Sequence, residues 1–491
     1  MSKAKAIMLQ GTMSNVGKSF LTAALCRIFK RKGYSVAPFK SQNMALNSFI
    51  TKDGSEIGRA QALQAQAAGL EPSALMNPIL LKPTTNIGSQ VIVNGRVRGN
   101  MRAADYFRHK KELIPDIMKA YDALAAEHDI IVIEGAGSPV ELNLKADDIV
   151  NMGLAKLVKS PVLLVGDIDR GGVFAQLIGT LDLLEPEERD MVKALIVNRF
   201  RGDISLFSDG IRILNEKSGK PTAGVVPYID CDIEDEDSLS DKLQNEKCGG
   251  LVDIAVIRLP KISNFTDADA LRQFDDVSVR FVSRPSQLGS PDFIIIPGTK
   301  STIADMKYLR ESGMEKAVTE RFKSGVPVFG ICGGYQIMGK SISDPLDTEC
   351  GGSIEGMCLL DCETVFGEEK RQTQVTGRFG KIGGFFSCLS GARFSGYEIH
   401  MGRTTHSGAP LTDIGGCFSG NAAGCYVHGI FDSAEVSRRL IEKLFAVKGS
   451  ERSVSASDRD EYRDRQLDIL ADSAENSLDM RLIYKILEEG I

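Results

Sequence analysis

The chain has 491 residues, a net charge of -6 and a hydrophobic content of 43%, which are typical of a globular protein with more than one domain. No basic excess marks a nucleic-acid surface, and no apolar run approaches the roughly 18 residues that a membrane span requires. The start does not resemble a signal peptide, and the ten cysteines form no CxxC pair. We therefore expect a cytoplasmic protein that binds neither nucleic acid nor membrane; the sequence leaves a homo-oligomer open.

Short apolar segments alternate with helical stretches along the chain. The predicted strands are 6–9, 35–39, 130–133, 162–165 and 195–197 in the first half and 254–257, 277–282, 293–296 and 326–329 in the second. Strands that are apolar on both faces belong to parallel sheets covered by helices on both sides. The sequence therefore predicts an α/β fold with two doubly wound, mainly parallel-sheet domains.

Composition divides the chain into four parts. Residues 1–229 form the first predicted domain, 230–250 an acidic linker, 251–446 the second domain and 447–491 a helical C-terminal extension. The linker is expected because 230–246 holds eight acidic residues and one basic residue. Apolar residues at helical spacing in the extension predict that it packs on the second domain.

A glycine-rich loop follows the first predicted strand and opens a helix. Its sequence is Gly11-Thr12-Met13-Ser14-Asn15-Val16-Gly17-Lys18-Ser19. Backbone N–H groups of such a loop cradle phosphate oxygens, and we expect ATP to bind there. Lys18 would reach the β- and γ-phosphates, and Ser19 would ligate Mg²⁺. Thr12 stands where the first glycine of the common pattern usually lies. The expected ATP-binding residues in this loop are Gly11, Thr12, Asn15, Val16, Gly17, Lys18 and Ser19.

Two further strands of the first domain end in polar residues. Glu134 closes the strand 130–133 and is a candidate ligand for Mg²⁺, directly or through water. Asn198 closes the strand 195–197, and its carboxamide is a candidate reader of the adenine edge of ATP. An ordinary strand-end acid and a turn asparagine are the structural alternatives.

Two loops that follow strands are candidates for a substrate surface. In α/β proteins, ligands bind at the carboxyl ends of the strands. Lys40 and Arg170 suit a phosphate or the carboxylates of a substrate. The candidate substrate-binding residues are Lys40, Gln42, Asn43, Asp167, Asp169 and Arg170. Simple loop chemistry is the alternative for both loops.

The second domain contains the segment Gly330-Ile331-Cys332-Gly333-Gly334 at the end of an apolar strand. Small residues on both sides of a nucleophile let the chain turn sharply and expose it, as in a nucleophile elbow. The helix that follows offers its N-terminus, which favours a thiolate. The sequence therefore predicts that Cys332 is a catalytic nucleophile.

A catalytic thiol needs a base and an oxyanion site. His428 follows a strand-like run near the end of the second domain and is the expected base; His400 is the rival, for which we favour a structural role. The backbone N–H groups of Gly333, directly after the nucleophile, and of Gly298, after the strand 293–296, are the expected oxyanion donors.

These motifs resemble two known families. The second domain is similar to the class I glutamine amidotransferases, which use a Cys-His-Glu triad, but Ile430 stands where their glutamate follows the histidine. The first domain resembles the dethiobiotin synthetase branch of phosphate-loop proteins. The pair on one chain resembles the branch of cobyric acid synthases and cobyrinic acid a,c-diamide synthases, which lack that glutamate. Five segments match the pattern of the cobyric acid synthases: 38–48, 58–65, 76–83, 167–174 and 396–402.

The resemblance implies a glutamine-hydrolysing ligase of cobalamin biosynthesis. ATP and glutamine would drive the amidation of the b, d, e and g carboxylates of adenosylcobyrinic acid a,c-diamide. The acid that orients His428 is not identified by the sequence. The alternatives are a cobyrinic acid a,c-diamide synthase, an amidoligase for another polycarboxylate, and a regulatory ATPase with an inactive amidotransferase-like domain.

Overall fold

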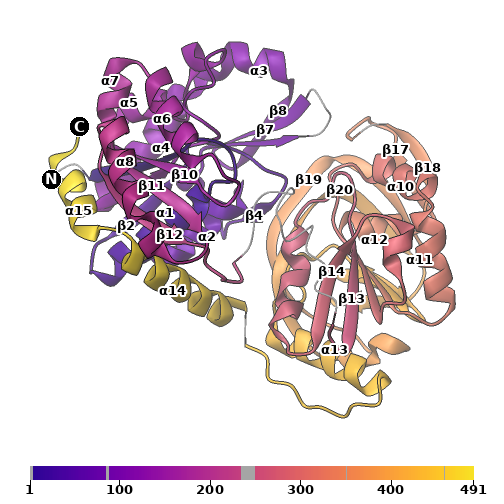
Figure 1. The fold of residues 1–491 in the computed structure, drawn as a ribbon. Helices are drawn as coiled ribbons and strands as arrows, with labels where there is room; N and C mark the ends of the chain where they lie inside the picture. The colour runs from indigo at the N-terminus through magenta and orange to yellow at the C-terminus, as the bar shows by residue number, and fades with distance from the viewer. Residues whose placement is uncertain (1–3, 84–87, 234–248, 350, 458) are drawn as a thin grey trace. The chain divides into compact units, whose positions relative to one another are not determined.

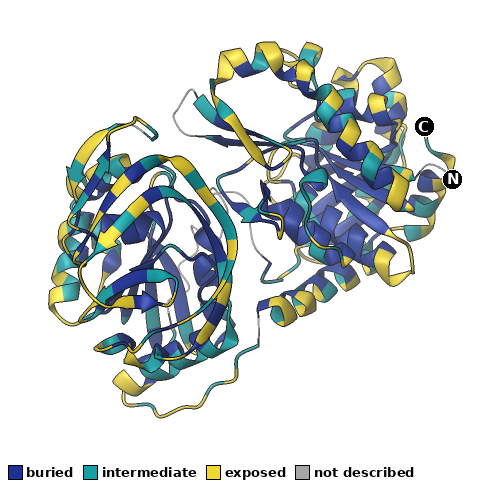
Figure 2. Cartoon of the chain, turned by 180° about the vertical axis from the view of Figure 1, so that it is seen from behind, coloured by how far each residue is buried: buried dark blue, intermediate teal, exposed yellow. Residues whose placement is uncertain are grey.

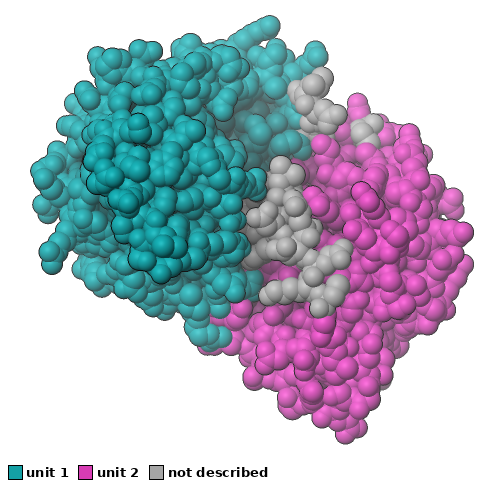
Figure 3. Space-filling model, viewed as in Figure 1, with its two compact units in different colours: residues 1–45, 55–233, 463–491 teal, residues 46–54, 234–462 magenta. Residues whose placement is uncertain are grey.

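The structure is a computed structural model that describes residues 4–83, 88–233, 249–349, 351–457 and 459–491. The chain divides into two compact units, coloured separately in Figure 3. Unit 1 comprises Met1–Ala45, Ser55–Ile233 and Arg463–Ile491, and unit 2 comprises Leu46–Gly54 and Glu234–Tyr462. Most of the predicted acidic linker 230–250 lies outside the described residues. Among the described residues, no helix is long and apolar enough to cross a membrane.

Unit 1 is built on a parallel sheet of six strands (Figure 1). Its order is β12 (Thr222–Pro227), β11 (Val192–Phe200), β10 (Val162–Asp167), β1 (Lys5–Gly11), β9 (Ile130–Glu134) and β2 (Val36–Phe39). Every pairing in this sheet is parallel, so all carboxyl ends meet at one edge. The five strands predicted for the first half of the chain are confirmed, and β12 is an additional edge strand.

Helices cover both faces of this sheet and bury two separate apolar cores. Alternate strand residues point to opposite faces: Met8 belongs to one core, whereas Ile7 and Leu9 belong to the other. The strands are therefore buried on both sides, as Figure 2 shows in dark blue. The main helices of the unit are α1 (Lys18–Arg31), α2 (Arg59–Ala68), α4 (Ile114–Glu127), α5 (Met152–Val158), α6 (Val173–Leu183) and α8 (Ser208–Ser218). The doubly wound prediction for the first half is confirmed.

A smaller sheet of unit 1 was not predicted. Its order is β3 (Gln42–Met44), β6 (Ile79–Pro83), β7 (Gly88–Val93) and β8 (Arg96–Arg102). The strand β5 (Glu56–Gly58) leads into α2. This sheet fixes the residues that follow β2, because β3 pairs in parallel with β6.

The C-terminal extension forms two helices, α14 (Arg459–Ser477) and α15 (Met480–Glu489). From Arg463 onward it belongs to unit 1, so the prediction that it packs on the second domain is wrong. Leu470 and Ile483 join the apolar core of α1, and Asp468 pairs with Arg27 of α1 at 2.8 Å. An apolar stripe indicates that one face of a helix is buried, but it does not identify the element that buries it. Here the charged residues of α1 identify α1 as the partner.

Unit 2 is built on a sheet of seven strands. Its order is β14 (Val277–Val282), β13 (Val252–Ile257), β15 (Phe293–Ile296), β16 (Val328–Ile331), β23 (Ala422–Cys425), β22 (Gly415–Ser419) and β21 (Pro410–Thr412). The first five strands pair in parallel and the last two pairings are antiparallel. The four strands predicted for the second half are confirmed.

A second sheet of unit 2 was also not predicted. Its order is β18 (Gly352–Glu355), β17 (Ser341–Asp344), β19 (Cys362–Arg378) and β20 (Arg393–His406). The helices that position the thiol site are α10 (Thr302–Glu311), α12 (Gly333–Ile337) and α13 (Ala434–Val447), together with the 3-10 helix η6 (Phe265–Gln273).

Candidate active sites

Cys332 lies at the turn between strand β16 and helix α12. Its φ of 51° and ψ of -109° form a conformation that residues other than glycine rarely adopt. Backbone strain of this kind is concentrated at functional sites, and it is the geometry of a nucleophile elbow. The thiol is 8% exposed.

Glycines allow helix α12 to begin this close to the sheet. A Cβ atom on Gly334 would lie 1.9 Å from the carbonyl oxygen of Ile296, and one on Gly330 would lie 2.7 Å from the backbone nitrogen of Tyr335. Both contacts are shorter than atoms tolerate, so only glycine fits at these positions. The pattern of small residues around Cys332 is thus a requirement of the turn itself.

His428 is the residue that the structure brings to the thiol. It follows strand β23, and its Nδ1 atom lies 2.7 Å from Oδ2 of Asp267. The second oxygen of Asp267 accepts a hydrogen bond from the backbone N–H of Gly429 at 2.8 Å. His428 and Asp267 are almost fully buried. Asp267 therefore holds the imidazole in place, while Ile430 is a buried apolar residue.

The charge state of His428 follows from these neighbours. Burial disfavours the imidazolium, but attraction to Asp267 and Cys332 and hydrogen bonds to both outweigh burial and raise the pKa of His428 to about 10. Cys332, His428 and Asp267 are thus one interacting group, whose charges and hydrogen bonds favour the imidazolium.

The two predicted oxyanion residues lie around this group. A Cβ atom on Gly298 would lie 2.9 Å from Cε1 of His428, and one on Gly333 would lie 2.6 Å from Cγ2 of Thr299. The loop after β15 therefore packs against both the imidazole and the first turn of α12. The binding of an oxyanion by the N–H groups of these two glycines stays a prediction.

His400 has a different environment from His428. Its Nδ1 atom lies 2.8 Å from the carbonyl oxygen of Gly402, and its ring stacks on Tyr426 at 3.6 Å between centroids. These contacts agree with the structural role that we favoured for it.

In unit 1, the phosphate loop connects β1 to α1. Gly17 has a φ of 93° and Asn15 a φ of 61°, and these left-handed conformations curl the loop. The Nζ atom of Lys18 donates to the carbonyl oxygens of Met13 at 3.0 Å and Gly137 at 3.1 Å. Burial lowers the pKa of Lys18 to about 8, although Glu134 acts in the opposite direction. The ammonium is therefore held inside the loop where phosphate oxygens would lie.

Glu134 is the centre of a buried polar cluster. Its Oε1 atom accepts hydrogen bonds from Ser19 and from Lys40, both at 2.8 Å, and its Oε2 atom accepts from Gln64 at 2.5 Å. Burial raises the pKa of Glu134, but Lys40 and the hydrogen bonds outweigh burial and lower it below its usual value. An ionised carboxylate beside a serine hydroxyl is a donor set that fits Mg²⁺.

Asn198 has a role that we did not predict. Its Nδ2 atom donates to the carbonyl oxygen of Val16 at 2.7 Å, and a Cβ atom on Gly17 would lie 2.2 Å from the same nitrogen. The side chain therefore braces the phosphate loop, and its reading of an adenine edge stays a prediction.

The candidate substrate residues follow the strands β2 and β10, at the carboxyl edge of the sheet. Lys40 is buried and pairs with Glu134 of the phosphate site at 2.8 Å, and its contact with a substrate stays a prediction. Asn43 donates to Gln61 at 2.9 Å, and Gln42 accepts from the hydroxyl of Tyr106 at 2.6 Å.

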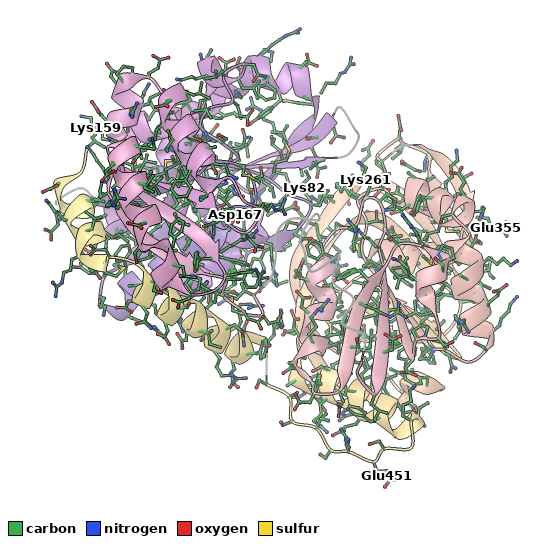
Figure 4. The ribbon with its side chains drawn as sticks, viewed as in Figure 1. Lys82, Lys159, Asp167, Lys261, Glu355 and Glu451 are labelled. Atoms are coloured by element: carbon green, nitrogen blue, oxygen red, sulfur yellow. The ribbon has the colours of Figure 1, made fainter. Side chains whose placement is uncertain are left out.

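The loop after β10 is more open. Asp167, labelled in Figure 4, is the last residue of β10 and pairs with Arg199 at 3.1 Å. Asp169 is exposed and pairs with Arg201 at 2.7 Å. Arg170 is exposed as well. Of the six candidates, the exposed residues of this loop are the ones best placed to meet a ligand.

Comparisons with known proteins match two family models to separate parts of the chain. Residues 253–436 match the model of the CobB/CobQ-like glutamine amidotransferase domain, and residues 7–240 match that of the CobQ/CobB/MinD/ParA nucleotide binding domain. A curated protein of Lachnoclostridium phytofermentans named cobyric acid synthase is 54% identical over 99% of this chain and 100% of its own length. Proteins of the same name from Ruminiclostridium cellulolyticum and Dehalococcoides mccartyi strain CBDB1 are 53% and 50% identical, over 99% of this chain and 98% and 100% of theirs.

Proposed function

Because the chain belongs to the cobyric acid synthase family, we propose that it amidates the b, d, e and g carboxylates of adenosylcobyrinic acid a,c-diamide with ATP and glutamine. The observation that carries this proposal is the group of Cys332, His428 and Asp267, which has the composition of a glutaminase triad. A phosphate loop on the same chain supplies the nucleotide site that a ligase needs.

Glutamine hydrolysis would occur in unit 2. The sulfur of Cys332 attacks the carboxamide carbon of glutamine, and the N–H groups of Gly298 and Gly333 stabilise the oxyanion. His428 then gives its proton to the departing ammonia, which leaves a glutamyl thioester on Cys332. Water, deprotonated by His428, hydrolyses this thioester to glutamate. Asp267 keeps Nδ1 of the imidazole oriented and supports its positive charge during both proton transfers.

Amide formation would use the nucleotide site of unit 1. A carboxylate is a poor electrophile, and phosphoryl transfer from ATP converts it to an acyl phosphate and releases ADP. Ammonia then attacks the acyl carbon and displaces inorganic phosphate, and loss of a proton gives the amide. Lys18 and the backbone of the phosphate loop bind the phosphates of ATP, and Asn198 keeps the loop in shape. Ser19 and Glu134 are the residues that would hold Mg²⁺, which neutralises phosphate charge when bound.

The corrinoid substrate carries several carboxylates, so cations at the sheet edge are needed to bind it. Arg170 is exposed in the loop that follows β10 and is the candidate for that role. Gln42 and Asn43 have side-chain partners in unit 1 and would act by shaping the site.

Mass spectrometry of adenosylcobyrinic acid a,c-diamide tests the proposal. The substrate is incubated with the protein, Mg-ATP and either glutamine or an ammonium salt. Four successive conversions of carboxylate to carboxamide are expected with both nitrogen sources. An unchanged substrate with both sources would contradict the proposed function.

A further inference from the structure

Residues 46–54 leave unit 1 and return to it, and the structure assigns them to unit 2 (Figure 3). We call this segment the tongue; it contains the strand β4 (Ser48–Ile50). Both of its roots are tied to strand β6 of unit 1. The N–H of Ala45 donates to the carbonyl oxygen of Leu81 at 3.1 Å, and Glu56 pairs with the buried Lys82 at 2.7 Å. The tongue is thus an excursion with two fixed ends.

Inside unit 2, the tongue contacts two residues that also contact His428. The N–H of Ser48 donates to Oδ1 of Asn264 at 3.1 Å, and the hydroxyl of Tyr397 donates to the carbonyl oxygen of Ser48 at 3.2 Å. The side chain of Asn47 accepts from the N–H of Phe265 at 3.3 Å. The residues that make these contacts are almost completely buried. Loss of one of these hydrogen bonds would leave a buried polar group without a partner, which is energetically costly.

Asn264 and Tyr397 lie against the imidazole on two sides. Nδ2 of Asn264 lies 3.3 Å from Nε2 of His428, the ring nitrogen that Asp267 does not use. The ring of Tyr397 stacks on the imidazole with centroids 5.2 Å apart and an interplanar angle of 22°. The backbones of Tyr397 and His428 also exchange two hydrogen bonds.

The tongue holds Asn264 at the start of helix η6. Asn264 has a φ of 50°, which is uncommon for a residue with a side chain, and it precedes the helix η6 that carries Asp267. The N–H of Ser48 donates to the side-chain oxygen of Asn264, and Asn47 accepts from the backbone N–H of Phe265, the next residue. The tongue therefore fixes both the side-chain amide of Asn264 and the first residue of η6.

The root of the tongue is close in sequence to the nucleotide site. Asn43, two residues before Ala45, donates to Gln61, and Nε2 of Gln61 lies 3.5 Å from Oε2 of Glu134. Glu134 in turn accepts from Ser19 of the phosphate loop. One continuous stretch of chain therefore joins the polar cluster of the phosphate site to the tongue.

We propose that the tongue is a positioning element of the glutaminase site, which makes the geometry of His428 depend on a segment rooted in the ATP-binding unit. This inference rests on the proposed function. Asn47 and Ser48 act through Asn264 and the start of η6, and Ser48 also acts through the hydroxyl of Tyr397, whose ring stacks on His428.

The test compares two tyrosine variants of the full-length protein. Tyr397→Phe removes the hydroxyl that binds the carbonyl of Ser48 and keeps the ring on His428. Tyr308→Phe is the matched control, because its hydroxyl donates to the backbone carbonyl of Ser283 at 3.4 Å in the same unit. We expect Tyr397→Phe to lower kcat for glutamine hydrolysis about tenfold with little change in KM, and Tyr308→Phe to behave as the wild type.

Asn47→Ala provides a second variant, in a residue that accepts a hydrogen bond from the N–H of Phe265 at the start of η6. It is expected to lower kcat for glutamine in the same way, while amidation driven by ammonium keeps its wild-type rate in all variants. A wild-type kcat for glutamine in both Tyr397→Phe and Asn47→Ala would overturn the proposal, as would an equal loss with glutamine and ammonium. Failure of the wild type to amidate the corrinoid with ammonium would instead overturn the proposed function, since the glutaminase readout does not depend on it.

Discussion

Oδ2 of Asp267 lies 2.7 Å from Nδ1 of His428, although 161 residues separate the two in the chain. The carboxylate that completes the thiol site thus comes from η6, at the start of unit 2, and not from the segment after the histidine. The same carboxylate accepts the N–H of Gly429, which fixes the backbone on which His428 lies. A triad acid supplied from another element explains how Ile430 can stand where related enzymes have glutamate.

Cys332→Ala separates the two nitrogen sources. The variant is expected to lose glutamine-dependent amidation, because the glutamyl thioester forms on the sulfur of Cys332, and to retain amidation driven by ammonium. The measurement is the rate of corrinoid amide formation with each source. Cys388→Ala is the control, since this thiol is half-buried in unit 2 beside the carbonyl oxygen of Phe385. Full glutamine-dependent activity in Cys332→Ala would show that the nucleophile is elsewhere.

Lys18→Ala affects the opposite step. Loss of the buried ammonium in the phosphate loop removes the charge that binds the phosphates of ATP, so amidation is expected to stop with both nitrogen sources. Glutamine hydrolysis measured alone is expected to remain, because its residues lie in unit 2. Substantial amidation by this variant with ammonium would contradict the assignment of the nucleotide site.

The C-terminal helix gives a prediction about stability. Leu470 on α14 is 1% exposed in the core shared with α1, whereas its neighbour Ile469 is 46% exposed. Leu470→Ala is expected to lower the free energy of unfolding of unit 1 by about 2–5 kcal/mol, and Ile469→Ala to change it little. Denaturant unfolding monitored by ATP-dependent amidation with ammonium measures both. Equal effects of the two variants would place the helix outside the core of unit 1.

The raised pKa of His428 predicts how the free energy of unfolding depends on pH. Its pKa in the folded protein is about 10, above the reference value of 6.5, so protonation stabilises the fold. This contribution is complete below about pH 6.5 and is lost as the pH rises toward 10, by at most about 1.4 kcal/mol for each pH unit. Unfolding midpoints from pH 6 to pH 10 are expected to fall more steeply for the wild type than for His428→Gln. His406→Gln, in the same unit, is the control and is expected to follow the wild type.

Local patterns predicted the parallel sheets, the phosphate loop and the thiol turn because each depends on residues adjacent in the chain. Apolar runs of four to six residues identify buried strands, and the glycines around Cys332 satisfy contacts within one turn. Asp267 escaped prediction because its role depends on the packing of η6 against the segment after β23. The segment Asn264-Phe265-Thr266-Asp267, at the carboxyl edge of β13, was the available signal.

The same limit explains the other differences. Asn198 and Lys40 follow strands as expected, but the sequence does not show that their polar atoms are used by Val16 and Glu134. The long strands β19 and β20 are half exposed and contain many polar residues, so they lack the apolar runs that identified the central sheet. The partner of α14 depends on charges that only the folded chain brings together.

The most direct test of the account is the rate of glutamine hydrolysis by Asp267→Asn, with ammonium-driven amidation by the same preparation as the internal control. Asparagine keeps the size of the side chain but removes the charge that orients and supports the imidazolium. We predict that kcat for glutamine falls on the order of 10²- to 10⁴-fold, while amidation with ammonium stays at the wild-type rate. A wild-type kcat for glutamine in Asp267→Asn would show that another group orients His428.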